Sequence, residues 1–234
     1  MKKFLILGLA LAFCFMATLP AAADTVNWTQ WSGTFTTSSS AGSASGTSGA
    51  IGVIYSGELE TIMFGYPGWG QPGTFSGGTI SNAPPSAGGI IQLFGGGAST
   101  APIVNTITFS QAVTNPVMAI WSLGQNGNIS QFNFGAQSFS IQSGGPSGEY
   151  GGSSIYSCNA GTTICGEEGN GTIMFNGTFN SITWTNPVYE NWYGFTVGTF
   201  EPERNPQVPE PSSIAFLASG LGSLGLLRRK LIGR

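Results

Sequence analysis

The amino-acid sequence predicts an all-β protein, a β-sandwich or jelly roll, flanked by an N-terminal signal helix and a single apolar C-terminal helix. Apolar and β-branched segments of strand length recur with a period of two residues. Gly, Pro, Asn and Ser separate these segments, and no stretch between the two ends has an amphipathic helical stripe. Many short strands joined by turns are typical of sandwiches and jelly rolls.

The composition indicates one folded domain with few charges. The chain has 234 residues, of which 37 are Gly and only 7% are charged. Charged residues make up about a quarter of an ordinary soluble domain. A low charge can indicate disorder, but disordered chains have few aromatic residues. Sixteen Phe, six Trp and six Tyr are enough to build a core, so we expect a folded chain.

The predicted strands are short and follow one another throughout the central part of the chain. Ile182 and Trp184 fall on one face of their strand and polar residues on the other, which is typical of a strand with one side in the core. Ser38–Gly49 is predicted to be a low-complexity loop, and Gly65–Gly89 a long Gly/Pro-rich loop. The expected strands are Val26–Thr36, Ala50–Tyr55, Leu59–Tyr66, Ile90–Phe94, Ile103–Phe109, Val117–Leu123, Ser130–Phe134, Gln137–Gln142, Gly171–Phe175, Phe179–Trp184 and Trp192–Phe200.

The N-terminus has the three parts of a secretory signal peptide. Two lysines precede the apolar segment Phe4–Leu19, and small residues follow it. Ala21 and Ala23 satisfy the A-x-A rule, so signal peptidase is expected to remove residues 1–23 and to leave Asp24 first. A membrane anchor would need a longer apolar segment.

The C-terminal part begins with a linker, residues 201–211, which contains four prolines. The apolar segment Ser212–Leu227 follows and would cover roughly 24 Å as a helix. The hydrocarbon core of a bilayer is about 30 Å thick, so this helix would span it only with thinning or snorkelling. The basic residues Arg228, Arg229 and Lys230 are expected to stay in the cytoplasm, with the 24–200 ectodomain outside.

The residues Val208, Pro209, Glu210, Pro211 and Ser212, with the apolar helix and basic end that follow, resemble the PEP-CTERM sorting signal of Gram-negative bacteria. The resemblance covers only about residues 207–232, and the sorting tail is taken as residues 208–234. It implies cleavage near Pro-Glu-Pro by an exosortase, a membrane transpeptidase. It also implies an inner-membrane-tethered intermediate, then a place at the cell surface or in an exopolysaccharide matrix. An ordinary membrane anchor is the alternative.

The charges between the two ends exclude one class of partner. Residues 24–207 contain one basic residue, Arg204, and nine acidic residues. A nucleic-acid-binding surface needs basic side chains that neutralise phosphates. We therefore expect no nucleic-acid partner.

The two cysteines outside the signal peptide, Cys158 and Cys165, are expected to form a disulfide that pins a surface loop in an oxidising compartment. A zinc site is a poor alternative, because the chain has no histidine to complete four ligands. The absence of histidine also excludes Ser-His-Asp and Cys-His catalysis. We expect no metal, no cofactor and no catalytic residue.

Two pairs of glutamates leave a hydrolase open, since a glycosidase needs only two carboxylates. Glu58 and Glu60 would share a strand face about 7 Å apart, and Glu167 and Glu168 are adjacent. Solvated loop or edge charges are the preferred interpretation, because an unsupported pair is a weak sign of a site. A Ca²⁺ site would use similar oxygen ligands, but no Asp-rich loop supports it.

Aromatic residues provide the better binding hypothesis, because exposed rings can stack on sugars. We expect Trp121 and Trp184 in the core, and we choose Tyr66 and Trp69 as the exposed ligand-binding pair. Further aromatic residues near the Asn186-Pro187 turn are Tyr189, Trp192 and Tyr193.

The sequence therefore predicts a non-enzymatic surface protein that binds exopolysaccharide or other envelope glycans. The polysaccharide partner comes from the family resemblance. One alternative is a structural coat protein that self-associates through exposed strand edges. The other is a hydrolase that acts on such polysaccharides through a glutamate pair.

Overall fold

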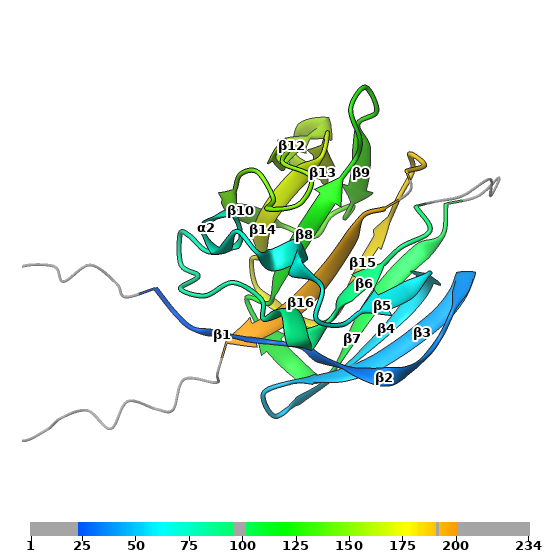
Figure 1. Cartoon of the computed structure of the whole chain (residues 1–234). Helices are drawn as coiled ribbons and strands as arrows, with labels where there is room; N and C mark the ends of the chain where they lie inside the picture. Colours follow the sequence, from blue (N-terminus) through cyan, green and yellow to red (C-terminus); the bar gives the residue numbers. More distant parts are fainter. Residues whose placement is uncertain (1–22, 96–101, 191, 201–234) are drawn as a thin grey trace, which may run out of the picture. The chain divides into compact units, whose positions relative to one another are not determined.

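A computed structural model describes residues 23–95, 102–190 and 192–200. Two β-sheets, antiparallel apart from one short pairing, pack face to face as a β-sandwich (Figure 1). The predicted fold class is therefore confirmed. The predicted signal helix and C-terminal apolar helix lie outside the described residues. Within the described ranges, no helix is long and apolar enough to cross a membrane.

Sheet I has a path of six strands with two further strands attached to it. The short strand β1 pairs with β16, and β11 pairs in parallel with β14. The strands in spatial order are β10 (Phe139–Gly144), β14 (Gly169–Phe175), β8 (Val117–Leu123), β16 (Gly194–Phe200), β6 (Ile90–Gln92) and β5 (Thr61–Met63), with β1 (Val26–Trp28) and β11 (Ser153–Ser154) attached.

Sheet II is a single antiparallel path of eight strands. Its two edges are formed by β12 and β2. In spatial order the strands are β12 (Tyr156–Cys158), β13 (Thr163–Gly166), β9 (Ser130–Asn133), β15 (Thr178–Thr185), β7 (Val104–Thr114), β4 (Ile51–Leu59), β3 (Ser38–Ser48) and β2 (Gln30–Thr36).

The core lies between the two sheets and is rich in aromatic rings. Trp184 of β15 is in ring contact with Tyr55 of β4, with Phe132 of β9 and with Phe195 of β16 on the facing sheet. Ile182 and Trp184 are both buried while Ser181 and Thr183 are exposed. The predicted period-two pattern of this strand is therefore confirmed, as is the burial of Trp121 and Trp184.

The prediction of a loop over Ser38–Gly49 is wrong, because this segment forms β3. Its small residues alternate, and Ala44 and Ser48 are buried while their neighbours are exposed. Gly46 lies so close to β2 that an added Cβ would be 2.5 Å from the Gln30 carbonyl oxygen. Low complexity here reflects close strand packing rather than a lack of structure.

The segment Gly65–Gly89 forms no long strand, in agreement with the prediction, but it folds as an ordered cover on sheet I. It contains the helical turns η1 (Pro67–Trp69), α2 (Pro72–Phe75) and η2 (Ser86–Gly88). Thr172 of β14 donates a hydrogen bond to the Phe75 carbonyl oxygen at 2.9 Å. Figure 1 shows α2 beside β10 and β14. Trp69 and Phe75 of this cover are buried but do not belong to the core cluster between the two sheets.

Candidate functional site

Two tyrosines and a glutamate meet over a buried tryptophan on sheet I. Tyr66 directly precedes η1, Glu149 and Tyr150 lie in the connection between β10 and β11, and Trp121 belongs to β8. The Trp121 ring centroid lies 5.6 Å from that of Tyr66 and 5.5 Å from that of Tyr150. We call Tyr66, Glu149 and Tyr150 the tyrosine–glutamate cluster.

Hydrogen bonds join the three polar ends of this cluster. The Tyr66 hydroxyl donates to Glu149 Oε1 at 2.6 Å. Because its single proton is used in that bond, the Tyr150 hydroxyl, 3.3 Å away, donates to the Tyr66 oxygen. Partial desolvation and the hydrogen bond to Glu149 raise the pKa of Tyr66 well above its ordinary value of 10. The phenol therefore remains a neutral donor at physiological pH.

Solvent reaches the two tyrosines but not the tryptophan beneath them. Trp121 is fully buried, Tyr66 is half-buried, and 45% of Tyr150 is exposed. Glu149 is also exposed. The two accessible tyrosine rings therefore pack on the buried Trp121 ring. The Glu149 carboxylate lies next to the Tyr66 hydroxyl.

A second group of carboxylates, Glu168 and Glu190, accepts hydrogen bonds from the residues that follow Trp121 in the chain. Ser122 has a positive φ of 56°, and its hydroxyl donates to Glu168 Oε2 at 2.6 Å. The Asn170 amide donates to the carbonyl oxygens of Gly151 and Glu168, at 3.3 and 2.8 Å. Asn170 thus connects the loop that carries Tyr150 to the backbone of Glu168.

Glu190 is the carboxyl of this group whose pKa is strongly raised. Burial raises its pKa from 4.5 to about 8, the Gly124 N–H opposes the rise, and the charge of Glu168 adds to it. Gly124 N–H donates to Glu190 Oε2 at 3.2 Å. The Glu190 carboxyl is therefore largely protonated at neutral pH.

Two exposed rings flank Glu190 in the chain. The exposed fractions are 55% for Tyr189 and 47% for Trp192, whereas Tyr193 is fully buried in the core. Trp192 has a φ of +87°, which is unusual for a bulky residue and frequent at functional positions. The Asn186-Pro187 region thus presents two accessible aromatic residues, not three.

The predicted ligand-binding pair, Tyr66 and Trp69, is divided by the structure. Tyr66 reaches solvent as part of the tyrosine–glutamate cluster. The expected exposure of Trp69 is wrong, since only 2% of it is exposed. Its ring packs edge-on against Phe75 with a centroid distance of 4.8 Å, so it belongs to the apolar layer of the Gly65–Gly89 cover.

The glutamate pairs agree only in part with the expectation of solvated charges, since Glu167 is exposed but Glu58 is not. Glu58 is fully buried at the end of β4, beside Tyr55 and Asn105, so that expectation is wrong for it. Glu60 lies after β4 ends and accepts a hydrogen bond from Gln92. Burial within the sandwich therefore separates Glu58 from solvent.

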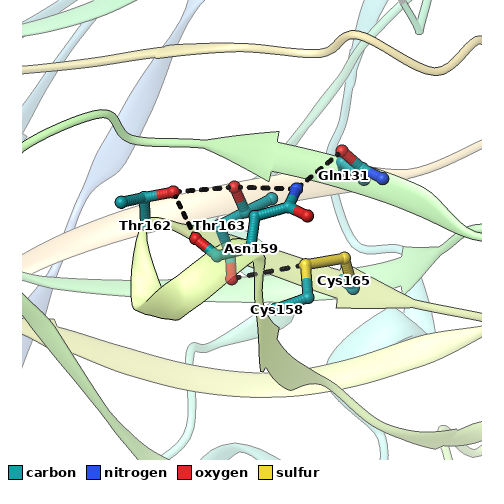
Figure 2. The surroundings of a disulfide bond; sticks show 6 residues. All are labelled: Gln131, Cys158, Asn159, Thr162, Thr163 and Cys165. Carbon is teal, nitrogen blue, oxygen red and sulfur yellow. Dashed lines mark hydrogen bonds between the residues drawn. A yellow bond between two sulfur atoms is a disulfide. The ribbon is translucent and has the colours of Figure 1, made fainter.

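The predicted disulfide between Cys158 and Cys165 is confirmed. It joins β12 to β13, which pair as an antiparallel hairpin with a Cα–Cα distance of 6.1 Å at the cysteines. Figure 2 shows the Asn159 amide beside Thr163 and Gln131, and the Asn159 nitrogen lies 3.5 Å from Gln131 Oε1. These contacts hold the hairpin against β9 and involve no residue of the tyrosine–glutamate cluster.

Two further expectations concern metal binding and the processing of the chain ends. Among the described residues, no group of three or more His, Cys, Asp or Glu side chains lies close enough to hold a metal ion. Asp24, the predicted first residue of the processed protein, donates its N–H to the Thr79 carbonyl oxygen. Ala21, the Val208–Ser212 motif and the Arg228–Lys230 end lie outside the described residues.

Sequence reasoning missed Glu149, Tyr150 and Glu190 as site residues. Glu149 and Tyr150 form an isolated pair in a Gly-rich loop, without a periodic or spaced pattern. The one signal available was an acidic residue beside an aromatic residue. Their contact with Tyr66, 84 positions away from Tyr150, depends on strand pairing and not on local sequence.

Comparison with known proteins identifies the C-terminal segment. The PEP-CTERM protein-sorting motif matches residues 207–230, which confirms the resemblance predicted from Val208–Ser212. No curated protein and no solved structure matches the chain. The chain therefore carries a PEP-CTERM motif, which implies an exported protein that an exosortase sorts to the cell surface.

Proposed function

We propose that this exosortase-sorted protein is a non-enzymatic surface module that binds glycans of the matrix or envelope through its tyrosine–glutamate cluster. The observation that supports the proposal is the pair of accessible rings, Tyr66 and Tyr150, packed on Trp121 beside the Glu149 carboxylate. Rings of this kind present an apolar face together with a polar edge. Sugars combine the same two features, a C–H face and hydroxyl groups.

The packing of the cluster favours binding because little order has to be created. Trp121 is fully buried and contacts both tyrosine rings, so their orientations are restrained before a ligand arrives. Glu149 is a charge-bearing acceptor for sugar hydroxyl groups, and hydrogen bonds to ionised acceptors are stronger than neutral ones. Stacking and hydrogen bonding would then act on one sugar unit together.

A glycan array probed with the full chain in a non-ionic detergent tests this proposal. We expect retention on at least one envelope or matrix glycan, and Tyr150→Ala should weaken it at least about tenfold. Tyr156→Ala is the matched control, since Tyr156 is equally exposed, at 42%, but belongs to β12 of sheet II. Absence of binding to every glycan, or equal losses in both variants, contradicts the proposal.

Hydrolysis is the second candidate, and Glu190 is the observation that favours it. A buried carboxyl with a pKa of about 8 could donate a proton. The charge of Glu168 contributes to raising the pKa of Glu190. The test is release of new reducing ends from the glycans that bind. Release that is lost in Glu190→Gln and in Glu168→Gln would replace the non-enzymatic proposal by a hydrolase. Intact glycans would exclude it.

A further inference from the structure

The charge of the ectodomain restricts the glycans that it can bind. Residues 24–200 contain no Lys, Arg or His and seven acidic residues. Glycans with carboxylate, sulfate or phosphate groups need cationic partners, usually Arg or Lys. The folded part of this chain has none to contribute, and its acidic side chains repel such ligands.

The tyrosine–glutamate cluster has the features of a site for a positive charge. The electron-rich faces of Tyr66 and Tyr150 attract a cation placed within about 6 Å of a ring centroid. The two rings are held on Trp121 at centroid distances of 5.6 and 5.5 Å. Glu149 lies at their hydroxyl ends, 2.6 Å from the Tyr66 oxygen. A ligand cation would therefore meet two ring faces and one carboxylate.

The Glu149 carboxylate has capacity for a ligand as well as for Tyr66. A carboxylate offers about four lone-pair sites on its two oxygens, and the Tyr66 hydroxyl uses one on Oε1. Glu149 is exposed at the protein surface. An ammonium group with three N–H donors can thus bind this carboxylate without displacing Tyr66.

Resting on the proposed glycan-binding function, we infer that the ligand is a cationic glycan whose amino sugars carry free ammonium groups. The ammonium binds Glu149 and the ring faces of Tyr66 and Tyr150. The apolar face of the same sugar stacks against a tyrosine. A neutral glycan loses the charge interactions, and an anionic glycan is repelled by the acidic surface.

Three oligosaccharides of equal length test this inference at pH 6, with the exported protein recovered from the surface of producing cells. The probes are a glucosamine oligomer, its fully N-acetylated form and an oligogalacturonate, each titrated by calorimetry at physiological salt. We expect the glucosamine oligomer to bind about tenfold more tightly than the N-acetylated one. Oligogalacturonate should not bind.

Two variants of equal charge localise the preference. Glu149→Gln keeps the shape of the side chain and should remove the preference for the amine, so that the glucosamine oligomer and the N-acetylated oligomer bind with similar affinity. Asp24→Asn removes the same charge from another exposed position and should retain the preference. Equal losses in both variants would show diffuse attraction to an acidic protein and would overturn the inference.

The remaining outcomes separate this inference from the function on which it rests. Equal or tighter binding of the N-acetylated oligomer overturns the inference and leaves the glycan-binding function in place. Binding of oligogalacturonate has the same consequence. If no glycan on the array binds, both the inference and the proposed glycan-binding function are contradicted. If Tyr150→Ala binds none of the oligosaccharides and its circular dichroism spectrum is unchanged, the binding measured takes place at the tyrosine–glutamate cluster.

Discussion

At the scale of single residues, burial distinguishes aromatic side chains that look alike in the sequence. Tyr66 and Trp69 lie on either side of Pro67-Gly68 in the same Gly/Pro-rich segment. Tyr66 reaches solvent with Glu149, whereas Trp69 packs against Phe75 within the apolar layer of the cover. Tyr66 is accessible to a ligand, and Trp69 stabilises the apolar layer that positions Tyr66.

Trp69→Ala should therefore act on stability. Replacing a buried tryptophan by alanine leaves a cavity, and we expect the free energy of unfolding to fall by about 3–5 kcal/mol. Equilibrium urea denaturation followed by circular dichroism measures this loss. Tyr150→Ala, at an exposed position, should change stability by less than about 1 kcal/mol. Equal urea midpoints for Trp69→Ala and the wild type would contradict the burial of Trp69.

Glu190 makes stability depend on pH in a defined direction. Its folded-state pKa is about 8, because burial disfavours the charged form, against an ordinary value of 4.5. Between pH 4.5 and pH 8, Glu190 is protonated in the folded state and has released its proton in the unfolded state. Its contribution to the free energy of unfolding thus falls as pH rises from 4.5 to 8 and is constant below 4.5.

Urea midpoints of the wild type and of Glu190→Gln at pH 5, 6, 7 and 8 test this dependence. The amide does not titrate, so the variant should lose less stability across this range than the wild type does. Glu60→Gln is the control, since Glu60 is a less buried carboxyl that accepts a hydrogen bond from Gln92. Parallel profiles for Glu190→Gln and the wild type would exclude Glu190 as the cause.

At the scale of elements, β3 shows how small residues serve as strand residues. Its Ser, Ala and Gly side chains allow β2 and β4 to pack closely on both sides. At Gly46 an added Cβ would lie 2.5 Å from the Gln30 carbonyl oxygen and 2.8 Å from Thr29 Cγ2. Side-chain volume, more than strand propensity, decides which residues fit here.

Gly46→Ala should consequently destabilise the edge of sheet II. We expect a loss of about 1–3 kcal/mol, because the backbone of β2 must move away. Gly33→Ala is the matched control on β2, where an added Cβ meets nothing within 4 Å. Hydrogen exchange of the β2 and β3 amides should accelerate in the first variant alone. Unchanged exchange in Gly46→Ala would show that the two strands can separate enough to hold a methyl group at position 46 without a cost in stability.

At the scale of the whole molecule, the absence of basic residues over 24–200 determines which polymers can approach. Seven acidic residues give this part of the chain a uniform sign of charge. Polyanions are repelled by such a surface at distances up to about 8 Å, the Debye length at physiological ionic strength. A neutral or cationic partner meets no such barrier.

The exported protein recovered from the surface of producing cells should therefore pass through a heparin column at about 0.15 M salt. It should be retained by an anion exchanger under the same conditions. Purification on both resins, with a basic protein of similar size as a positive control, provides the measurement. Retention on heparin would mean that a positive surface exists and would also weaken the case for a cationic ligand.

The sequence by itself determined the sandwich, most of its strands, the disulfide and the sorting motif, since each is encoded in a local pattern. Period-two alternation identified Phe179–Trp184, because a strand exposes alternate residues to one side. A continuous apolar segment identified Val117–Leu123, which is buried at every position. Both patterns failed for β3, β12 and β13, where short or small-residue strands carry little apolar signal.

Only the tertiary structure decided which aromatic rings reach solvent and which carboxylates lie beside them. Tyr66 and Glu149 are 83 positions apart, and they meet because the Gly65–Gly89 cover and the β10–β11 connection both lie against sheet I. Glu190 acquires its perturbed pKa in the same way, from burial beside Gly124 and Glu168. Contacts of this kind depend on packing between segments distant in the chain, which no local pattern records.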